Sequence, residues 1–183
     1  MKISGKVLKY KSNADDINTD VIWPGKYTYV QIPKEEMHKY AMETYDPDFK
    51  NKAKSHQILV VGKNLGCGSS REQASECLKY SGIKAIIARS FARIFYRNSI
   101  NIGLPVIESN EAVDAIKNED DVEIDLVNGE IIINNDNKIK ISKYPEFVLQ
   151  LIKDDGLINH IKKENENNKN NENNNIKNNN DGE

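Results

Sequence analysis

Nine consecutive residues, 64–72, combine the residue types of an anion-binding site. They read Asn-Leu-Gly-Cys-Gly-Ser-Ser-Arg-Glu, follow the apolar run 58–61 and precede a helical pattern. The glycine-rich turn thus joins a buried strand to a helix N-terminus, where free N–H groups and the helix dipole favour negative charge. Ser69, Ser70 and Arg71 add two hydroxyls and a planar guanidinium that suits bidentate binding. This combination predicts an anion site and favours a carboxylate as its ligand.

Ser69 and Glu72 also fit a simpler role, because a serine followed three residues later by glutamate forms a capping box at a helix start. A cap requires only one hydroxyl, and it does not require Gly66 and Gly68 on either side of the cysteine. Glycine lets the backbone approach a ligand closely. We therefore predict a site in which Gly66 and Gly68 are supporting residues, with the capping box as the alternative.

The elements that position this turn follow from hydrophobic periodicity. Strands are predicted at residues 2–10, 57–62, 84–88, 104–107, 122–127, 130–134 and 139–142. Helices are predicted at 34–43, 70–81, 111–117, from a cap at Ser90 to Gly103, and from Pro145 onward. The strand–helix–strand unit around the turn predicts parallel pairing, and Asn128-Gly129 predicts a hairpin. The pattern indicates an α/β layered domain with a mixed sheet and flanking helices.

Composition restricts the class of protein. A chain of 183 residues with a net charge of −2 fits one domain and favours no nucleic-acid partner. The chain has no apolar run of membrane-spanning length and no signal-peptide core, so we expect a cytoplasmic protein with no membrane partner. Two cysteines and three scattered histidines are too few for a cubane iron–sulfur cluster, so we expect no metal or cofactor held by this chain.

The last twenty residues differ sharply in composition from the rest. They contain eleven Asn and a single apolar residue, Ile176. Such a segment cannot bury enough apolar surface to offset the entropy of ordering it. The sequence therefore predicts a folded domain over residues 1–163 and a disordered Asn-rich tail over residues 164–183.

Several ordered motifs resemble one known family. Residues 64–74 and 82–98, together with Asp-Ile-Asn-Thr-Asp-Val-Ile-Trp-Pro-Gly at 16–25, are similar to the small subunits of isopropylmalate dehydratase. Those subunits are the separate swivel domain of the aconitase superfamily, and the resemblance extends over roughly residues 1–163. It implies a swivelling β/β/α fold.

The resemblance also implies a reaction and its residues. The reaction is a hydro-lyase isomerisation in leucine biosynthesis, in which dehydration and rehydration move a hydroxyl between adjacent carbons of a malate derivative. The family pattern assigns the base to Ser69 and the binding of a substrate carboxylate to Ser70 and Arg71. A 4Fe-4S cluster belongs to the large subunit, so the small subunit is expected to act only in a heterodimer or heterotetramer with that partner.

Residues Tyr27, Thr28, Tyr29 and Val30 occupy the segment that selects the substrate in this family. Relatives that act on tricarboxylates carry an arginine there. Residues 28–30 offer no cation, and an unpaired buried carboxylate is costly, so we expect an apolar side group on the substrate. Isopropylmalate, citramalate and 2,3-dimethylmalate all remain open. Asp20 lies in the same loop as either a turn former or a supporting residue of the site.

Two rival functions remain at this point: a non-catalytic anion-binding α/β module, and a pure assembly subunit. Against the first, the turn has neither a dinucleotide fingerprint nor a Walker lysine. Against the second, an assembly subunit has no need of the Ser-Ser-Arg cluster. Arg89, Arg93 and Arg97 follow at a spacing of four and predict either a solvated basic face or a contact with the partner or the substrate.

Overall fold

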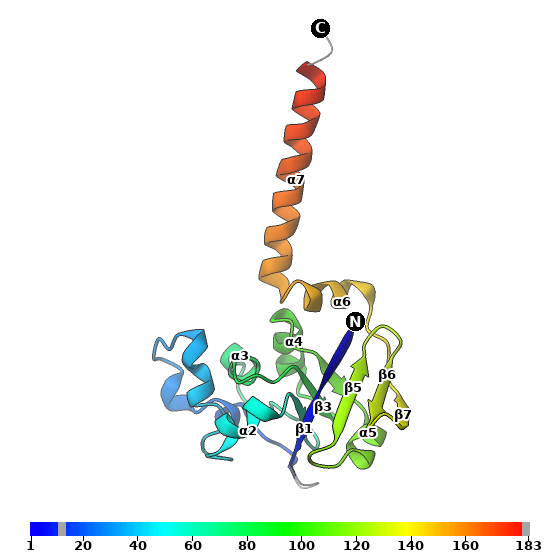
Figure 1. Cartoon of the computed structure of the whole chain (residues 1–183). Helices are drawn as coiled ribbons and strands as arrows, with labels where there is room; N and C mark the ends of the chain where they lie inside the picture. The colour runs from blue at the N-terminus through cyan, green and yellow to red at the C-terminus, as the bar shows by residue number, and fades with distance from the viewer. Residues whose placement is uncertain (11–13, 181–183) are drawn as a thin grey trace.

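A seven-stranded mixed sheet organises the part of the chain that the computed structural model describes, residues 1–10 and 14–180 (Figure 1). The strand order is β4-β3-β2-β1-β5-β6-β7. The strands are β1 (Lys2–Lys9), β2 (Ile58–Val60), β3 (Ala85–Ala88), β4 (Val106–Glu108), β5 (Asp121–Asp125), β6 (Glu130–Ile133) and β7 (Asn137–Lys140). The first four are parallel, and β5, β6 and β7 join the other side of β1 as an antiparallel meander.

The helical elements are α1 (Thr19–Ile22), η1 (Gly25–Tyr27), η2 (Lys34–Lys39), α2 (Phe49–Ser55), α3 (Glu72–Tyr80), α4 (Arg93–Asn101), α5 (Asn110–Ala115), α6 (Glu146–Lys153) and α7 (Leu157–Asn180). The sequence predicted an α-helix at 34–43, but the structure has the shorter 3-10 helix η2 there. The short helices α1 and α2 were missed. A helix of one or two turns has too few periodic positions to stand out from a loop.

The connections between the parallel strands decide where the loops meet. From β1 to β4 each strand is added on the same side, so right-handed crossovers place α3 and α4 on one face of the sheet. Residues of α5 pack in the apolar cluster on the other face. All four parallel strands end at the same edge, so the loops that follow β1 and β2 are brought together there.

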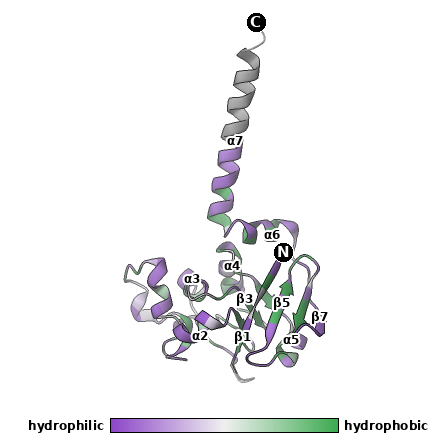
Figure 2. Cartoon of the chain, viewed as in Figure 1, coloured by the Kyte–Doolittle hydropathy of each residue, from purple (hydrophilic) through white to green (hydrophobic). Residues whose placement is uncertain are grey.

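The apolar run at residues 58–61 is explained by burial on both faces of the sheet. Leu59 and Val61 belong to the cluster beneath α3 and α4, whereas Ile58 and Val60 belong to the cluster beneath α5. All four side chains are at most 1% exposed. Figure 2 shows green, apolar residues in the strands of the sheet, with purple, polar residues among them in β5 and β7. The mixed sheet, the parallel β2–β3 pair and the hairpin between β5 and β6 confirm the predictions.

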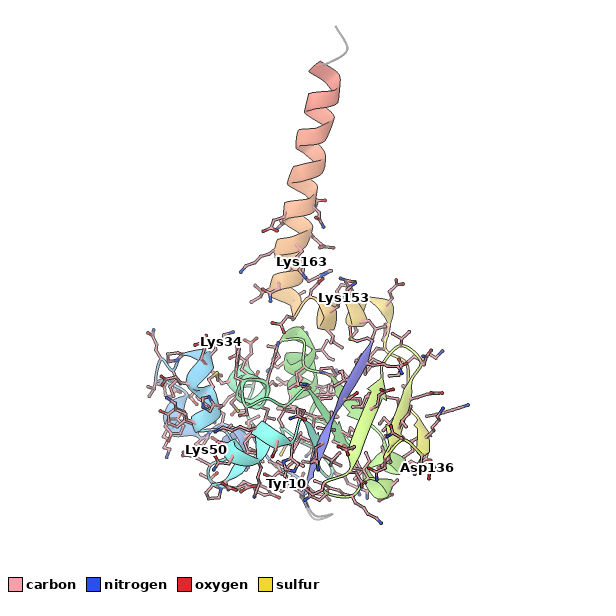
Figure 3. The ribbon with its side chains drawn as sticks, viewed as in Figure 1. Tyr10, Lys34, Lys50, Asp136, Lys153 and Lys163 are labelled. Atoms are coloured by element: carbon pink, nitrogen blue, oxygen red, sulfur yellow. The ribbon has the colours of Figure 1, made fainter. Side chains whose placement is uncertain are left out.

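Helix α7 continues to Asn180 as it leaves the body of the protein (Figure 1). The disordered tail expected over residues 164–183 remains a prediction. The first turns of the helix are anchored to Asp154, which accepts hydrogen bonds from His160 at 2.7 Å and Lys163 at 2.6 Å (Figure 3). No proline or glycine interrupts residues 157–180, so the chain carries no strong helix breaker there. Residues 181–183 lie outside the described residues. A domain boundary at residue 163 remains a prediction.

Candidate active site

Two loops, residues 14–20 after β1 and 62–71 after β2, are joined by backbone hydrogen bonds. The amide of Gly66 donates to the Ile17 carbonyl at 2.8 Å, and the amide of Thr19 donates to the Cys67 carbonyl at 2.8 Å. Side chains add to this contact, since Asn64 donates to the Asp16 carboxylate at 2.7 Å. The aspartate-rich loop therefore holds the glycine-rich turn in place along its length.

The two glycines of the turn have different roles. Both have positive φ, 77° at Gly66 and 98° at Gly68, a region that side chains with a Cβ rarely adopt. A Cβ on Gly66 would lie 2.2 Å from Phe95 Cγ, so Gly66 is needed for packing against α4. This packing gives a reason for glycine at position 66 that needs no ligand, and its supporting role in the site remains a prediction. Gly68 is exposed, and a Cβ there would lie 3.2 Å from Thr19 Oγ1.

The predicted capping box does not form. Helix α3 begins at Glu72, its N-cap is Arg71 in an extended conformation, and no side chain caps it. The chain is still extended at this point because the preceding turn is tied to the first loop, where Thr19 Oγ1 donates to the Ser69 carbonyl at 3.0 Å. Ser69 and Ser70 are exposed, and Ser69 Oγ has only a 3.4 Å contact with Thr19 Oγ1. The Ser69 hydroxyl is therefore not engaged in starting the helix.

Helix α4 also begins later than predicted. Its N-cap is Ala92 rather than Ser90. Ser90 Oγ instead accepts a hydrogen bond from the amide of Asn64 at 2.9 Å. The tertiary contact with the glycine turn replaces the predicted local cap.

Arg71 lies against Asp20. Its Nη1 donates to Asp20 Oδ1 at 2.5 Å and to the Trp23 carbonyl at 3.3 Å, and the arginine side chain is 18% exposed. A Cβ on Gly25 would lie 3.7 Å from both Nη atoms, so this glycine borders the guanidinium. Within the described residues, Nη2 has no hydrogen-bond partner, which leaves one side of the fork available to a ligand. Asp20 thus orients the arginine and lies within the candidate site.

The segment 27–30 is split between packing and exposure. The Tyr27 ring lies 4.4 Å from that of Tyr40, and its hydroxyl donates to Glu43 at 3.1 Å, so these contacts hold the side chain in place. Tyr29 and Val30 are 96% and 56% exposed. The four residues line a pocket of about 320 Å³, together with Trp23, Lys34, Met37, Gln73 and Glu76.

The floor of that pocket carries polar groups that sequence reasoning missed. Lys34 forms an ion pair with Glu76 at 2.6 Å, where η2 approaches α3 (Figure 3). Trp23 Nε1 and Thr28 Oγ1 are buried and have no hydrogen-bond partner among the described residues. Trp23 connects this pocket to Arg71, because its carbonyl accepts from the guanidinium. No local pattern signals these contacts, since they join segments far apart in the sequence.

The described part of the chain bears on ligands and on membranes. Among the side chains that the structure describes, no three of His, Cys, Asp or Glu gather in an arrangement that could bind a metal ion. None of the described helices combines the length and the apolar character that crossing a membrane requires. Burial raises the pKa of the Cys67 thiol above its usual range, which disfavours a reactive thiolate in the turn.

Comparisons with known proteins give one consistent result. Residues 2–112 match the aconitase C-terminal domain family. The 3-isopropylmalate dehydratase small subunit of Caldanaerobacter subterraneus is 51% identical over 164 residues, which cover 88% of this chain and 98% of that protein. The corresponding subunit of Clostridium acetobutylicum is 48% identical over 166 residues, covering 89% and 98%. The crystal structure of 3-isopropylmalate dehydratase (leuD) from Methanocaldococcus jannaschii matches with a TM-score of 0.80 and 44% identity, covering 90% of this chain and 96% of that chain.

Proposed function

Because this chain belongs to the aconitase C-terminal domain family and to the small subunits of 3-isopropylmalate dehydratase, we propose that it interconverts 2- and 3-isopropylmalate together with a large subunit. It is the substrate-recognising subunit of this hydro-lyase, acting in leucine biosynthesis in the cytoplasm. The observation that carries the proposal is that one loop presents both an exposed Ser69, whose hydroxyl does not cap a helix, and an Arg71 that is oriented by Asp20. The names of the relatives favour isopropylmalate over citramalate and 2,3-dimethylmalate.

The chemistry required of this chain is the removal of a proton from a carbon next to a carboxylate. We assign the binding of that carboxylate to Arg71, through the side of its fork that Asp20 leaves free, and to the Ser70 hydroxyl. Ser69, as the alkoxide, takes the proton from carbon. The hydroxyl on the adjacent carbon accepts a proton at the interface with the large subunit and leaves as water, which gives the alkene. Water then adds back in the opposite sense: its hydroxyl joins the carbon that lost the proton, its remaining proton returns to the interface, and the Ser69 hydroxyl gives its proton to the other carbon.

Ser69 needs support from Arg71 and from the partner subunit to act as a base. It must first lose its own proton, and a serine hydroxyl is ordinarily too weak an acid to do so. The positive charge of Arg71 must therefore lower the pKa of the hydroxyl. Ser69 and Ser70 are exposed in this chain, and a solvated alkoxide would simply be protonated by water. The partner must therefore cover the loop and exclude water.

We assign a 4Fe-4S cluster to the large subunit, where it would supply Lewis-acid chemistry for the departing hydroxyl when bound. The thiols of this chain agree with the assignment of the cluster to the large subunit. The thiol of Cys77 is fully buried in the core, and Cys67 is the other cysteine of the chain. We propose a heterodimer or a heterotetramer with the large subunit, and a solution mass measurement of the complex distinguishes the two.

We propose that the pocket lined by residues 27–30, which Trp23 connects to Arg71, selects the substrate. We assign the apolar side group to the surface of Thr28, Tyr29 and Val30, while Tyr27 holds the segment by packing on Tyr40. Lys34 supplies a cation to the lining, but its charge is paired with that of Glu76. The pocket therefore offers no unpaired charge to a third carboxylate, which favours an isopropyl group.

Reconstitution tests the proposal. Each subunit is purified anaerobically with iron and sulfide, and isopropylmalate turnover is followed alone and after mixing. We expect turnover only in the mixture, with the visible absorption of the cluster in the large subunit. Turnover or cluster absorption from this chain alone, or a mixture that acts on citramalate and not on isopropylmalate, would contradict it.

A further inference from the structure

We propose that Arg93 and Arg97, with Ile94 beside them on the outer face of α4, form a docking surface for carboxylates and apolar groups of the large subunit. This inference rests on the proposed function, because the occupant is the partner that completes the site. It assigns to α4 a role separate from the binding of the substrate.

The use of arginine in this chain is highly localised. The sequence contains 22 Lys and only 4 Arg, and all four arginines fall within residues 71–97. Elsewhere lysine supplies the positive charge of the surface. Arginine differs from lysine by its planar fork, which binds carboxylates in two parallel hydrogen bonds and is more easily desolvated in an interface. In a chain that otherwise uses lysine, an arginine indicates a position where the planar fork itself is needed.

Two of the four arginines have partners within this chain. Arg71 pairs with Asp20, and Arg89, which precedes α4, pairs with Asp114 at the end of α5. Arg93 and Arg97 are exposed and form no ion pair or side-chain hydrogen bond with any of the described residues. Ile94 is 47% exposed beside them. Two guanidiniums without partners beside an exposed apolar side chain are typical of a protein–protein interface and less so of a solvated surface.

The start of α4 lies directly beside the candidate catalytic turn. The amide of Ala92 donates to the Leu65 carbonyl at 2.9 Å, and the amide of Leu65 donates to the Ser90 carbonyl at 3.1 Å. The backbone of Gly66 packs on Phe95, on the buried side of the same helix. A partner that covers Ser69 therefore comes close to the start of α4, where Arg93 is exposed. Both arginines lie within one helical turn of each other, so a single acidic surface can engage both.

The test compares charge-conserving and charge-removing variants of the full chain. The purified large subunit is titrated into labelled wild type, into Arg93→Lys/Arg97→Lys and into Arg93→Gln/Arg97→Gln, and Kd is measured at several salt concentrations. The matched control is Lys138→Gln/Lys140→Gln on the edge strand β7, which removes the same charge from a distant face. Thermal melts establish that each variant is folded.

We expect the lysine pair to raise Kd at least about tenfold and the glutamine pair to raise it further with a weaker salt dependence, while the β7 control leaves Kd unchanged. An unaltered Kd in both arginine variants would overturn the inference and leave the proposed function standing. A higher KM for isopropylmalate at saturating large subunit, with Kd unchanged, would also overturn it by assigning the arginines to the substrate. Failure of wild type to bind or turn over with the large subunit would instead overturn the proposed function.

Discussion

Replacement of Ser69 by alanine separates a catalytic serine from a structural one. A serine that caps a helix stabilises the protein by about 1 kcal/mol. Ser69 does not cap α3, and its hydroxyl makes a single 3.4 Å contact with Thr19 Oγ1 at an exposed position. We therefore expect Ser69→Ala to change the free energy of unfolding by no more than about 0.5 kcal/mol. For a chain of this size that corresponds to a shift in melting temperature of about 2 °C or less.

Activity should respond very differently. Removal of a base that acts on carbon should lower kcat at least about 10²-fold, which is ~2.7 kcal/mol of transition-state free energy. The assay is isopropylmalate turnover by the reconstituted complex, with melting of the isolated chain measured in parallel. Ser4→Ala is the matched control, because Ser4 is exposed near the start of β1, away from the edge that carries the site.

The two measurements can refute the reasoning separately. If Ser69→Ala retains kcat within a few-fold of wild type, Ser69 is not the base. If the variant melts several degrees lower than both wild type and Ser4→Ala, the serine has a structural role that its contacts here do not account for.

Four further predictions concern other parts of the molecule. Arg71→Lys should raise KM for isopropylmalate at least about tenfold because a point charge replaces the fork; an unchanged KM would remove Arg71 from the binding site. Tyr29→Arg should admit a tricarboxylate such as homocitrate, since a third carboxylate gains a partner; steady-state kinetics that change equally for every substrate would show that the segment does not read the side group. Deletion of residues 164–183 keeps Lys163 and its bond to Asp154, so melting temperature and turnover should stay essentially unchanged; a loss of several degrees would show that the segment is docked. Lys163 and His160 hold the pKa of Asp154 well below its usual range, so its stabilisation is present above about pH 4 and is lost as pH falls toward the depressed value. Thermal melts of Asp154→Asn should therefore be less pH-dependent than those of wild type in this acidic range, and parallel curves would contradict that account.

Strands and the candidate turn were accessible from local patterns. The apolar run before the turn predicted a buried strand, and Asn128-Gly129 predicted the β5–β6 hairpin, because both signals depend on a few neighbouring residues. The residue types of Ser69, Ser70 and Arg71 are likewise a local property. Helix starts were predicted less well, since Ser69 and Ser90 carry capping residue types but are engaged by other loops.

The amino-acid sequence by itself determined the chemistry that this protein carries: which residues can bind a carboxylate, where the strands run, and which family the motifs resemble. Tertiary structure alone decided the partner of each group. It paired Arg71 with Asp20, packed Gly66 on Phe95, bonded Tyr27 to Glu43 and gave Arg93 and Arg97 no partner among the residues that the structure describes. The physical reason is that these contacts join residues that are 16 or more positions apart, which no local pattern relates. Arg71 meets Asp20, for example, because the parallel order of β1 and β2 brings the loops after these strands to one edge of the sheet.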